Sequence, residues 1–180
     1  MPMLEIRRHS KRDGDEAIHL SQEGVELARW SGTLMGPFEV VATSVAPRAR
    51  ETAIAMGFAV TTELPTLHNV NAFLQESQAA SQDVGAPFTR LARLVHRRGS
   101  AVNDYSFALA RQWAELMAPL GPGDAALVIG HGGHIECALV ALFPEAAHDE
   151  WGALFGYMEG ARLHYDTAAR RFHDIEFVRG

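Results

Sequence analysis

The sequence predicts a three-layer α/β/α protein with a mostly parallel central sheet and a C-terminal antiparallel hairpin at the sheet edge. Short apolar runs alternate with segments of helical spacing. Helices separate the strands, which implies parallel crossover connections. Two period-two segments around a short turn close the chain. The 180 residues, 47% of them hydrophobic, suffice for one core, so we expect a single domain over residues 1–180.

The N-terminal part of the chain is predicted to alternate strand and helix. Leu4 and Ile6 lie at period two in a strand that runs into Arg8 and His9. Ser21 is the expected N-cap of a helix that ends near Gly32. The next elements are a buried strand, a helix that begins at a proline and ends at a glycine, and a third strand: Val40–Ser44, Pro47–Gly57 and Phe58–Thr62.

The rest of the chain begins with its least regular part. Residues 63–85 are polar, and we expect only a short turn of helix there, around Phe73. Apolar residues at helical spacing predict helices over Pro87–Arg98 and Tyr105–Leu120. A central parallel strand, a helix and the two hairpin strands follow: Ala125–Gly130, Ile135–Phe143, Ala161–Asp166 and Phe172–Val178.

Composition narrows the classes of function. A net charge of -6 argues against a general nucleic-acid or membrane-surface binder, since such proteins normally carry a basic excess. We expect no membrane segment, because no apolar run approaches the length that spans a bilayer. The single cysteine, Cys137, cannot form an internal disulfide, which fits a reducing compartment and a cytoplasmic protein. The sequence does not predict the oligomeric state.

Cationic groups follow three of the predicted strands. Arg8 and His9 end the first strand, Arg48 follows the second, and His131 follows the central strand. Because the carboxyl ends of parallel strands meet at one edge of a sheet, these four side chains are expected to converge on one anion. The amides of Gly132–Gly133, at a helix N-terminus, would add donors. Guanidinium groups suit phosphate, since their planar fork bonds two oxygens at once.

Four ordered segments between Met3 and Phe143 resemble motifs of the histidine phosphatase superfamily (phosphoglycerate mutase-like). Arg8-His9-Ser10 is similar to the R-H-G element, and Leu20-Ser21 with Gly24 is similar to L-(S/T)-x-x-G. The S-P-L-x-R-A-x-Q-T-A element is matched by Ser44 with Arg48-Ala49 and Thr52-Ala53. The S-H-G-G element is matched by Gly130-His131-Gly132-Gly133. The chain is short, which makes it more similar to the phosphatase and phosphohistidine phosphatase members than to the full-length mutases.

The resemblance implies a metal-independent phosphatase that hydrolyses a phosphate monoester or a phosphohistidine. It implies that His9 is the nucleophile and forms a phosphohistidine intermediate, that Arg8, Arg48 and His131 bind the phosphoryl group and stabilise its transition state, and that Gly132 contributes to phosphate binding. No metal or cofactor is then expected. The implied partner is a phosphorylated small molecule or a protein that carries phosphohistidine. Physical chemistry agrees, because nearby cations disfavour a protonated imidazole and keep the nucleophile neutral.

The sequence departs from the motifs at two tolerable positions and one serious one. Ser10 replaces a glycine and Val45-Ala46 replaces Pro-Leu, but neither supplies a reacting group. Many relatives carry a glutamate that protonates the leaving oxygen, whereas the corresponding segment here is Leu67-His68-Asn69. Some phosphohistidine phosphatases of the superfamily act without it, because a labile leaving group needs less help. The candidates for a general acid are Glu63, His68, Glu76 and Asp15.

Two other interpretations compete with a phosphatase. His131, His134 and Glu136 contain metal-ligating groups, but the glycine pair between the histidines lies at a strand-to-helix turn, so the side chains need not share a face. We therefore expect no metal, and His134 is expected to be a pocket wall or an ordinary helix N-terminal residue. The alternative function is a non-catalytic phosphate-binding or regulatory module on the same fold, which the missing acid favours and the imidazole of His9 does not explain.

Overall fold

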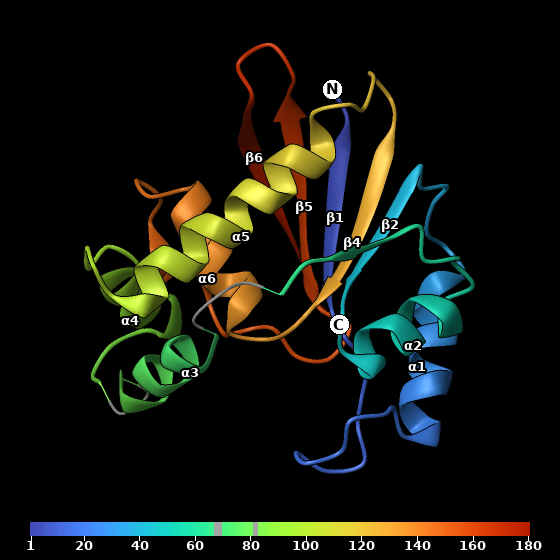
Figure 1. Cartoon of the computed structure of the whole chain (residues 1–180), viewed down its shortest axis with the longest axis horizontal. Coiled ribbons are helices and arrows are strands. Elements are labelled where there is room, and N and C mark those ends of the chain that lie inside the picture. The colour runs from blue at the N-terminus through green and yellow to red at the C-terminus, as the bar shows by residue number, and fades with distance from the viewer. Residues whose placement is uncertain (67–69, 81–82) are drawn as a thin grey trace. The chain divides into compact units, whose positions relative to one another are not determined.

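The structure is a computed structural model that describes residues 1–66, 70–80 and 83–180 (Figure 1). The chain divides into two compact units. The first, here called the sheet unit, comprises Met1–Pro65, Ala114–His131 and Phe155–Gly180, and the second, the helical unit, comprises Thr66–Trp113 and Gly132–Leu154. The single domain over residues 1–180 stays a prediction.

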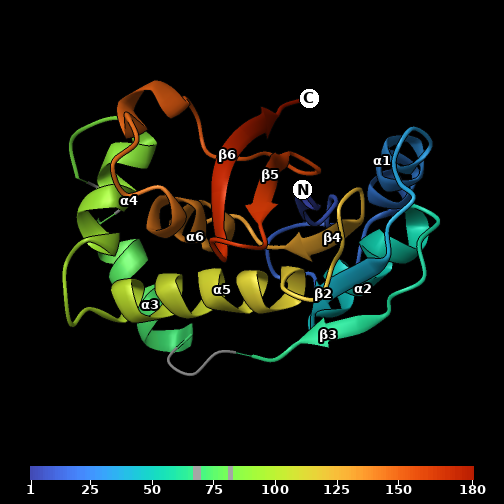
Figure 2. The same ribbon diagram turned by 90° about the horizontal axis from the view of Figure 1, so that it is seen from above.

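A six-stranded sheet forms the centre of the sheet unit (Figures 1 and 2). Its order is β3-β2-β4-β1-β5-β6. The first four strands in this order are parallel, β5 is antiparallel to β1, and β6 is antiparallel to β5. The strands are β1 Met3–Arg8, β2 Val40–Ser44, β3 Thr62–Leu64, β4 Ala125–Gly130, β5 Gly160–Asp166 and β6 Arg171–Val178. The predicted α/β class, with helices flanking a mostly parallel sheet and an antiparallel hairpin at its edge, is confirmed.

The register of β1 against β4 aligns the ends of the two central strands. Leu4 pairs with Ala126, and Arg8 pairs with Gly130 at the carboxyl end. The strand β2 joins the other side of β4 with Thr43 opposite Ile129. The residues that follow β1, β2 and β4 therefore leave the sheet at the same edge, as parallel pairing requires.

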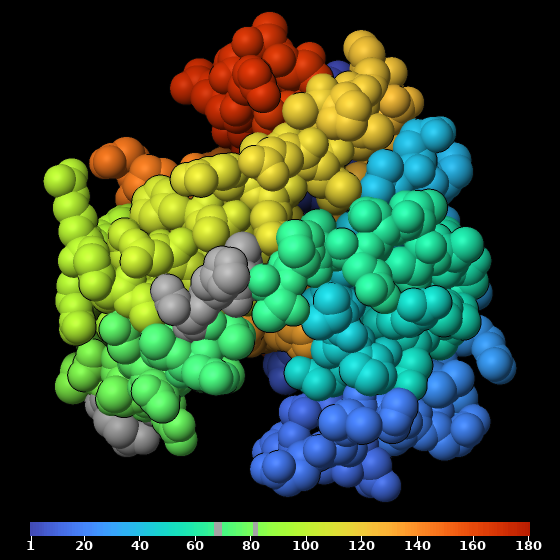
Figure 3. Space-filling model, in the orientation of Figure 1, coloured from blue at the N-terminus to red at the C-terminus, as the bar shows by residue number. Residues whose placement is uncertain are grey.

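Two helices of the sheet unit, α1 (Gln22–Gly32) and α2 (Pro47–Ala55), lie side by side and pack together (Figures 1 to 3). Small side chains allow this close approach, since Ala28, Ala49 and Ala53 are all fully buried. With them in one apolar cluster are Val41 of β2 and Leu127 of β4. The cluster fixes the start of α2 relative to the strands β2 and β4, and Arg48 is the second residue of that helix.

The helical unit contains α3 (Val70–Ala79), α4 (Pro87–Val95), most of α5 (Ala101–Met117), α6 (His134–Leu142) and a short 3-10 helix, η2 (His148–Trp151). The helix α6 is mostly apolar, and its residues from Ile135 to Ala141 are buried, including the carboxylate of Glu136. The predictions for α4, α5 and α6 are confirmed to within a few residues at each end.

Two predicted elements differ from the structure. The prediction of a third strand over Phe58–Thr62 is wrong except at Thr62, where β3 begins. The residues before β3 serve packing instead, with the Phe58 ring 5.1 Å from that of Phe38 and the Thr61 amide bonded to Val41. The short turn around Phe73 is in fact the ten-residue helix α3, which buries only that phenylalanine and so lacks a clear apolar face.

No helix in the described part of the chain combines the length and the apolar character needed to cross a membrane.

The fold explains why the L-S-x-x-G segment ends in a glycine, Gly24. The Gly24 amide donates to Oγ of Ser21, the N-cap of α1 (3.1 Å), and its carbonyl accepts from Ser10 Oγ (2.7 Å). A Cβ on Gly24 would lie 2.0 Å from the carbonyl oxygen of Lys11. Glycine therefore lets the first turn of α1 touch the loop that follows His9.

We expect the substitution Gly24→Ala to lower the free energy of unfolding by about 1–3 kcal/mol, the usual cost of overpacking. The sign is informative, because alanine normally stabilises a helix by about 0.5–1 kcal/mol relative to glycine. Urea unfolding measures the change. The control is Glu26→Ala at an exposed position of the same helix, which should change stability by less than about 0.5 kcal/mol. An equally small change in Gly24→Ala would show that the contact relaxes at no cost.

Candidate phosphoryl-transfer site

The carboxyl end of β1 places His9 beside the carboxyl end of β4. The His9 amide donates to the carbonyl of Gly130 (2.9 Å), which continues the β1–β4 pairing one residue past the strand. The next residue along β4 is His131, and the His9 and His131 rings meet edge to face with centroids 5.2 Å apart. His9 is only 3% exposed. Parallel pairing alone thus brings together two histidines that are 122 positions apart in the sequence (131 − 9).

The contacts of His9 fix its tautomer. Nδ1 lies 2.8 Å from the carbonyl oxygen of Ser10, and a carbonyl can only accept, so Nδ1 carries the proton. Nε2 lies 3.2 Å from Nε of Arg48, which can only donate. Nε2 therefore presents a lone pair, and that lone pair is directed toward a guanidinium.

A short chain of hydrogen bonds ties Arg48 to the loop after His9. The Ser10 amide donates to Oγ1 of Thr52 (3.0 Å), and that hydroxyl donates to the carbonyl of Arg48 one turn earlier in α2 (2.7 Å). The Ser10 hydroxyl is fully buried but bonded to Gly24. Serine at this position is accommodated because its hydroxyl has a partner, which avoids the cost of burying an unsatisfied polar group.

His131 is held by the end of β2. Its Nε2 shares a hydrogen bond of 2.7 Å with Ser44 Oγ. Ser44 is the last residue of β2, and its Oγ also accepts a long bond from the amide of Ala46 (3.4 Å). Ser44 thereby links the second histidine of the site to the turn that leads into α2.

Arg8 is held by the segment that precedes β5. Its Nη1 donates to the carbonyl of Phe155 (2.7 Å). Its Cζ lies 4.6 Å from the centroid of the Tyr157 ring, a cation–π distance. The same tyrosine ring lies 5.8 Å from the ring of His9. Arg8 and His9, adjacent in sequence, therefore share one aromatic neighbour.

Burial and positive charge both oppose protonation of His9. Burial lowers the pKa of His9, and the guanidinium groups of Arg48, Arg8 and Arg12 lower it further, to about 4 despite the bond to Ser10. Burial and the charge of Arg12 also lower the pKa of Arg48. The charged groups that shift the pKa of His9 are all arginines. The site therefore holds a neutral imidazole among fixed cations at neutral pH.

The structure brings together Arg8, His9, Arg48 and His131, four residues of the sheet unit singled out in the sequence; these four are called the His9 site below. Gly132 directly follows His131 in the turn before α6 and is the first residue of the helical unit after it. A phosphate-binding role for Gly132 stays a prediction.

Glu136 and His134, which could have been metal ligands together with His131, have other contacts in the structure. The Gly133 amide donates to Oε2 of Glu136 (2.6 Å), so this carboxylate caps α6. His134 begins α6, bonds through Nδ1 to the hydroxyl of Tyr105 (2.6 Å) and lines a cavity of about 470 Å³ within the helical unit. Among the described residues, no group of three or more histidine, cysteine or acidic side chains is arranged to hold a metal ion.

The three general-acid candidates that the structure describes have other partners. Asp15 is exposed and 3.6 Å from Nη2 of Arg12, and Glu63 is exposed and paired with Arg50 at 3.0 Å. Glu76 belongs to the helical unit and accepts from the amide of Val102 (3.2 Å). His68 lies outside the described residues. A role as general acid stays a prediction for each of them.

Three contributors to the site had no assigned role in the sequence. Ser44 and Thr52 stand inside the motif around Arg48, but only the fold shows that they bond to His131 and Ser10. Tyr157 gave no signal at all. It stands in an irregular segment without a recognisable motif, far in sequence from every other member of the site.

The sequence matches no protein-family model and no curated protein. Its structure resembles solved structures over essentially the full chain, among them two named as phosphatases. A phosphoserine phosphatase from Entamoeba histolytica, in complex with 3-phosphoglyceric acid, is 15% identical, with 100% of this chain and 98% of that chain covered and a TM-score of 0.65. A mycobacterial glucosyl-3-phosphoglycerate phosphatase, complexed with VO3, is 19% identical, with 98% and 97% covered and a TM-score of 0.65. Bacillus stearothermophilus YhfR is 18% identical, with 96% and 95% covered and a TM-score of 0.63.

These neighbours are members of the histidine phosphatase superfamily, from its short phosphatase branch. At 15–19% identity the similarity shows the fold and does not identify the substrate of this chain. The strand order, the positions of the four motifs and the neighbours over the whole chain agree: this chain has the histidine phosphatase fold.

Proposed function

We propose that the chain is a metal-independent phosphatase that acts through a phosphohistidine on His9. The observation that carries the proposal is the state of the His9 ring. Its Nδ1 proton is committed to Ser10, and its Nε2 lone pair faces the guanidinium of Arg48. A site that only bound phosphate would gain more from a further cation than from a buried neutral imidazole.

The proposed reaction has two displacements at phosphorus. In the first, Nε2 of His9 attacks, the N–P bond forms, and the bond between phosphorus and the leaving oxygen breaks with its electron pair on that oxygen. In the second, water attacks phosphorus, the N–P bond breaks, and its electrons return to Nε2. The proton that the water releases to solvent balances the proton that the leaving oxygen takes up from solvent. Inorganic phosphate and the original neutral His9 result, so the cycle needs no further reactant.

The cations around His9 have the charge that this chemistry needs. Phosphoryl transfer spreads negative charge over the equatorial oxygens, and Arg8 and Arg48 provide fixed positive charge beside the nucleophile. Arg48 is anchored through its backbone to Thr52, and Arg8 through its guanidinium to Phe155, so little reorganisation is required when charge develops. His131 adds a third group that can bond a phosphoryl oxygen.

The substrate we propose is a phosphorylated small molecule with a leaving group that needs modest protonation, with a protein phosphohistidine as the second possibility. The structural neighbours named as phosphoserine phosphatase and glucosyl-3-phosphoglycerate phosphatase act on phosphate monoesters, which supports the first. Two carboxylates of the sheet unit, Asp15 and Glu63, are paired with Arg12 and Arg50. We place the reaction in the cytoplasm, in keeping with the free buried Cys137.

We expect the protein to hydrolyse p-nitrophenyl phosphate in excess chelator, because nitrophenolate leaves without a proton. An acid quench during turnover should trap labelled phosphate on the protein. Both signals should disappear in His9→Ala. The matched control is His173→Ala on the exposed face of β6, which should keep turnover within about twofold.

Two results would contradict the proposal. Turnover that requires a metal ion would exclude the metal-independent route. Absence of both turnover and trapped phosphate, in folded protein that still binds phosphate, would favour the non-catalytic phosphate-binding or regulatory module.

The protonation of His9 gives a second prediction. A pKa of about 4 means that the ring is neutral throughout pH 5–8 and gains a proton only below that range. The imidazole carbon shifts of His9, assigned by comparison with His9→Ala, should therefore titrate near 4 in the folded protein. In urea the same signal should titrate near its ordinary value of 6.5. Since the unfolded chain then binds more protons between these two values, stability should fall as the pH drops from 6.5 toward 4. A folded midpoint near 6.5 would refute the neutral nucleophile.

The role of Arg48 can be separated from that of a surface arginine on the same helix. Arg48→Met should lower kcat/KM by about 10²–10³, the usual effect of removing one preorganised donor from a transition state. Arg50→Met should change it by less than about twofold, because Arg50 only forms an exposed pair with Glu63. Steady-state kinetics with p-nitrophenyl phosphate measures both. Similar losses in the two variants would indicate a general effect of charge rather than a contact at His9.

A further inference from the structure

The segment Phe155–Glu159, which leads into β5, encloses Arg8 from several sides. The Arg8 amide donates to the carbonyl of Glu159 (2.8 Å), and the Arg8 carbonyl accepts from the amide of Met158 (3.2 Å). The guanidinium donates to the carbonyl of Phe155 (2.7 Å). Three residues of this segment thus hold both the backbone and the side chain of Arg8.

Tyr157 is the residue of this segment that faces the His9 site. Its half-buried ring lies 4.6 Å from Cζ of Arg8 and 5.8 Å from the ring of His9. An arginine side chain has many rotamers, and a cation–π contact on one face of the guanidinium restricts them while leaving its N–H edges able to bond oxygen. The ring therefore limits the motion of the cation and of the nucleophile together.

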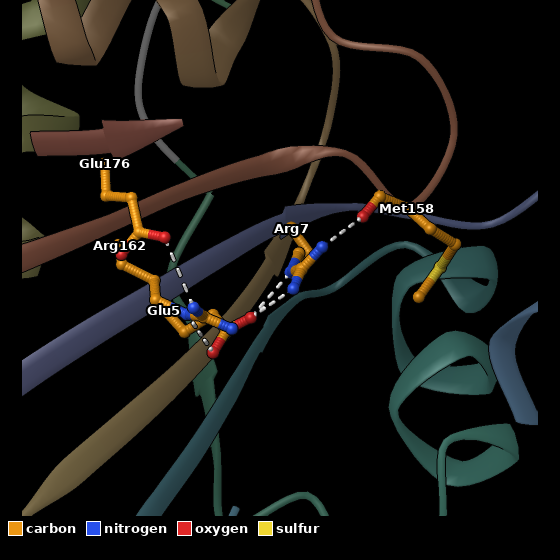
Figure 4. A network of polar contacts seen from close by, with 5 residues as sticks. All are labelled: Glu5, Arg7, Met158, Arg162 and Glu176. Atoms are coloured by element: carbon orange, nitrogen blue, oxygen red, sulfur yellow. Dashed lines mark hydrogen bonds and ion pairs between the residues drawn. The ribbon is translucent and has the colours of Figure 1, made fainter. Parts of the chain in front are cut away.

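A buried ion pair between two residues of β1, Glu5 and Arg7, fixes the backbone next to Tyr157. Figure 4 shows Arg7 directed toward the carbonyl of Met158, to which its Nη1 donates at 2.9 Å. Arg7 Nε donates to Oε1 of Glu5 at 2.7 Å, and both side chains are buried. The other carboxylate oxygen of Glu5 accepts from Arg162 Nε at 3.2 Å. This network, with Glu176 as the outer partner of Arg162, spans β1, β5 and β6 (Figure 4).

The backbone that this network holds is unusual. Met158 has φ of +62°, in the left-handed region that a residue with a side chain rarely adopts. Such a conformation persists only where the surroundings determine it. Here the Met158 carbonyl is bound by Arg7, its amide is bound by Arg8, and its side chain is buried in the apolar cluster that also contains Ile129. The turn at Met158 is therefore imposed by its contacts, and it directs the preceding residue, Tyr157, toward Arg8 and His9.

We propose that Tyr157 is a positioning residue of the His9 site. Its ring, rather than its hydroxyl, holds the guanidinium of Arg8 and the imidazole of His9 in the orientation used for phosphoryl transfer. This inference rests on the proposed function for its catalytic meaning. Its structural content, the orientation of the cation that binds phosphoryl oxygens, can be tested separately.

The test compares three variants. Tyr157→Phe keeps the ring and removes the hydroxyl, whereas Tyr157→Leu removes the ring. Phe177→Leu is the matched control, because Phe177 is also a half-buried ring near an arginine of the sheet unit, Arg179, at 5.4 Å. Phe177 is not one of the four residues of the His9 site, although its ring lies 5.8 Å from that of Phe155, so the control also measures the effect of loosening that side chain. Thermal unfolding shows whether each variant is folded.

We expect Tyr157→Leu to lower kcat/KM for p-nitrophenyl phosphate about tenfold and to weaken vanadate binding by a similar factor, a size typical of a partly desolvated cation–π contact. Vanadate adopts the five-coordinate geometry of the transition state, so it reports orientation of the ligands. Inorganic phosphate, which resembles the ground state, should lose less than threefold. Tyr157→Phe and Phe177→Leu should stay within twofold of wild type in all three measurements.

Three results would overturn the proposal. Equal losses in Tyr157→Phe and Tyr157→Leu would assign the role to the hydroxyl. Equal weakening of phosphate and vanadate would indicate a general loss of affinity rather than of orientation. If folded Tyr157→Leu bound vanadate with the affinity of the wild type, Tyr157 would have no positioning role. Vanadate binding is measured by calorimetry and needs no turnover. A wild-type protein that binds vanadate without turnover would refute the proposed function, and the comparison of variants would still decide the role of Tyr157.

Discussion

The His9 site depends on the parallel pairing of β1 with β4. Arg8 stands opposite Gly130, so the residues immediately after each strand, His9 and His131, leave the sheet together. A shift of one residue in this register would move His9 along β4 and turn the side chains of β1 to the other face of the sheet. The apolar pattern of β1 prevents the shift, because Leu4 and Ile6 are completely buried. Packing of the strand therefore determines the geometry of the site.

The same strand has two chemically different faces at its carboxyl end. Leu4, Ile6 and Arg8 alternate with Glu5 and Arg7, as the period of a strand requires. Arg8 is directed to the His9 site, while Arg7 and Glu5 form the buried pair that fixes the carbonyl of Met158. A buried ion pair is weak evidence for stability, since desolvation offsets its attraction. Its value here is conformational, because it determines the path of the segment that bears Tyr157.

Much of this arrangement could be predicted from the sequence, because the edge of a parallel sheet is a property of topology. Arg8, His9, Arg48 and His131 are each recognisable from the strand that precedes them. Tyr157 is not, since it reaches the site through a left-handed turn at Met158 and a long-range bond from Arg7. Long-range contacts of this kind leave no local pattern in the amino-acid sequence. The length of helix α3 was underestimated for a related reason, because the helix buries only Phe73 and leaves apolar residues such as Leu74 exposed.

The substitution of Ser10 for the glycine of the motif shows how the site tolerates change. A glycine at this position leaves room, but the Ser10 hydroxyl is fully buried and finds an acceptor in the carbonyl of Gly24. That carbonyl belongs to the first turn of α1, where the absence of a Cβ on Gly24 allows contact with the loop after His9. The Ser10 carbonyl meanwhile accepts the Nδ1 proton of His9. The serine thus adds a tether between α1 and the backbone that sets the tautomer of His9, so a departure from the motif is compatible with the geometry on which the proposed nucleophilic attack depends.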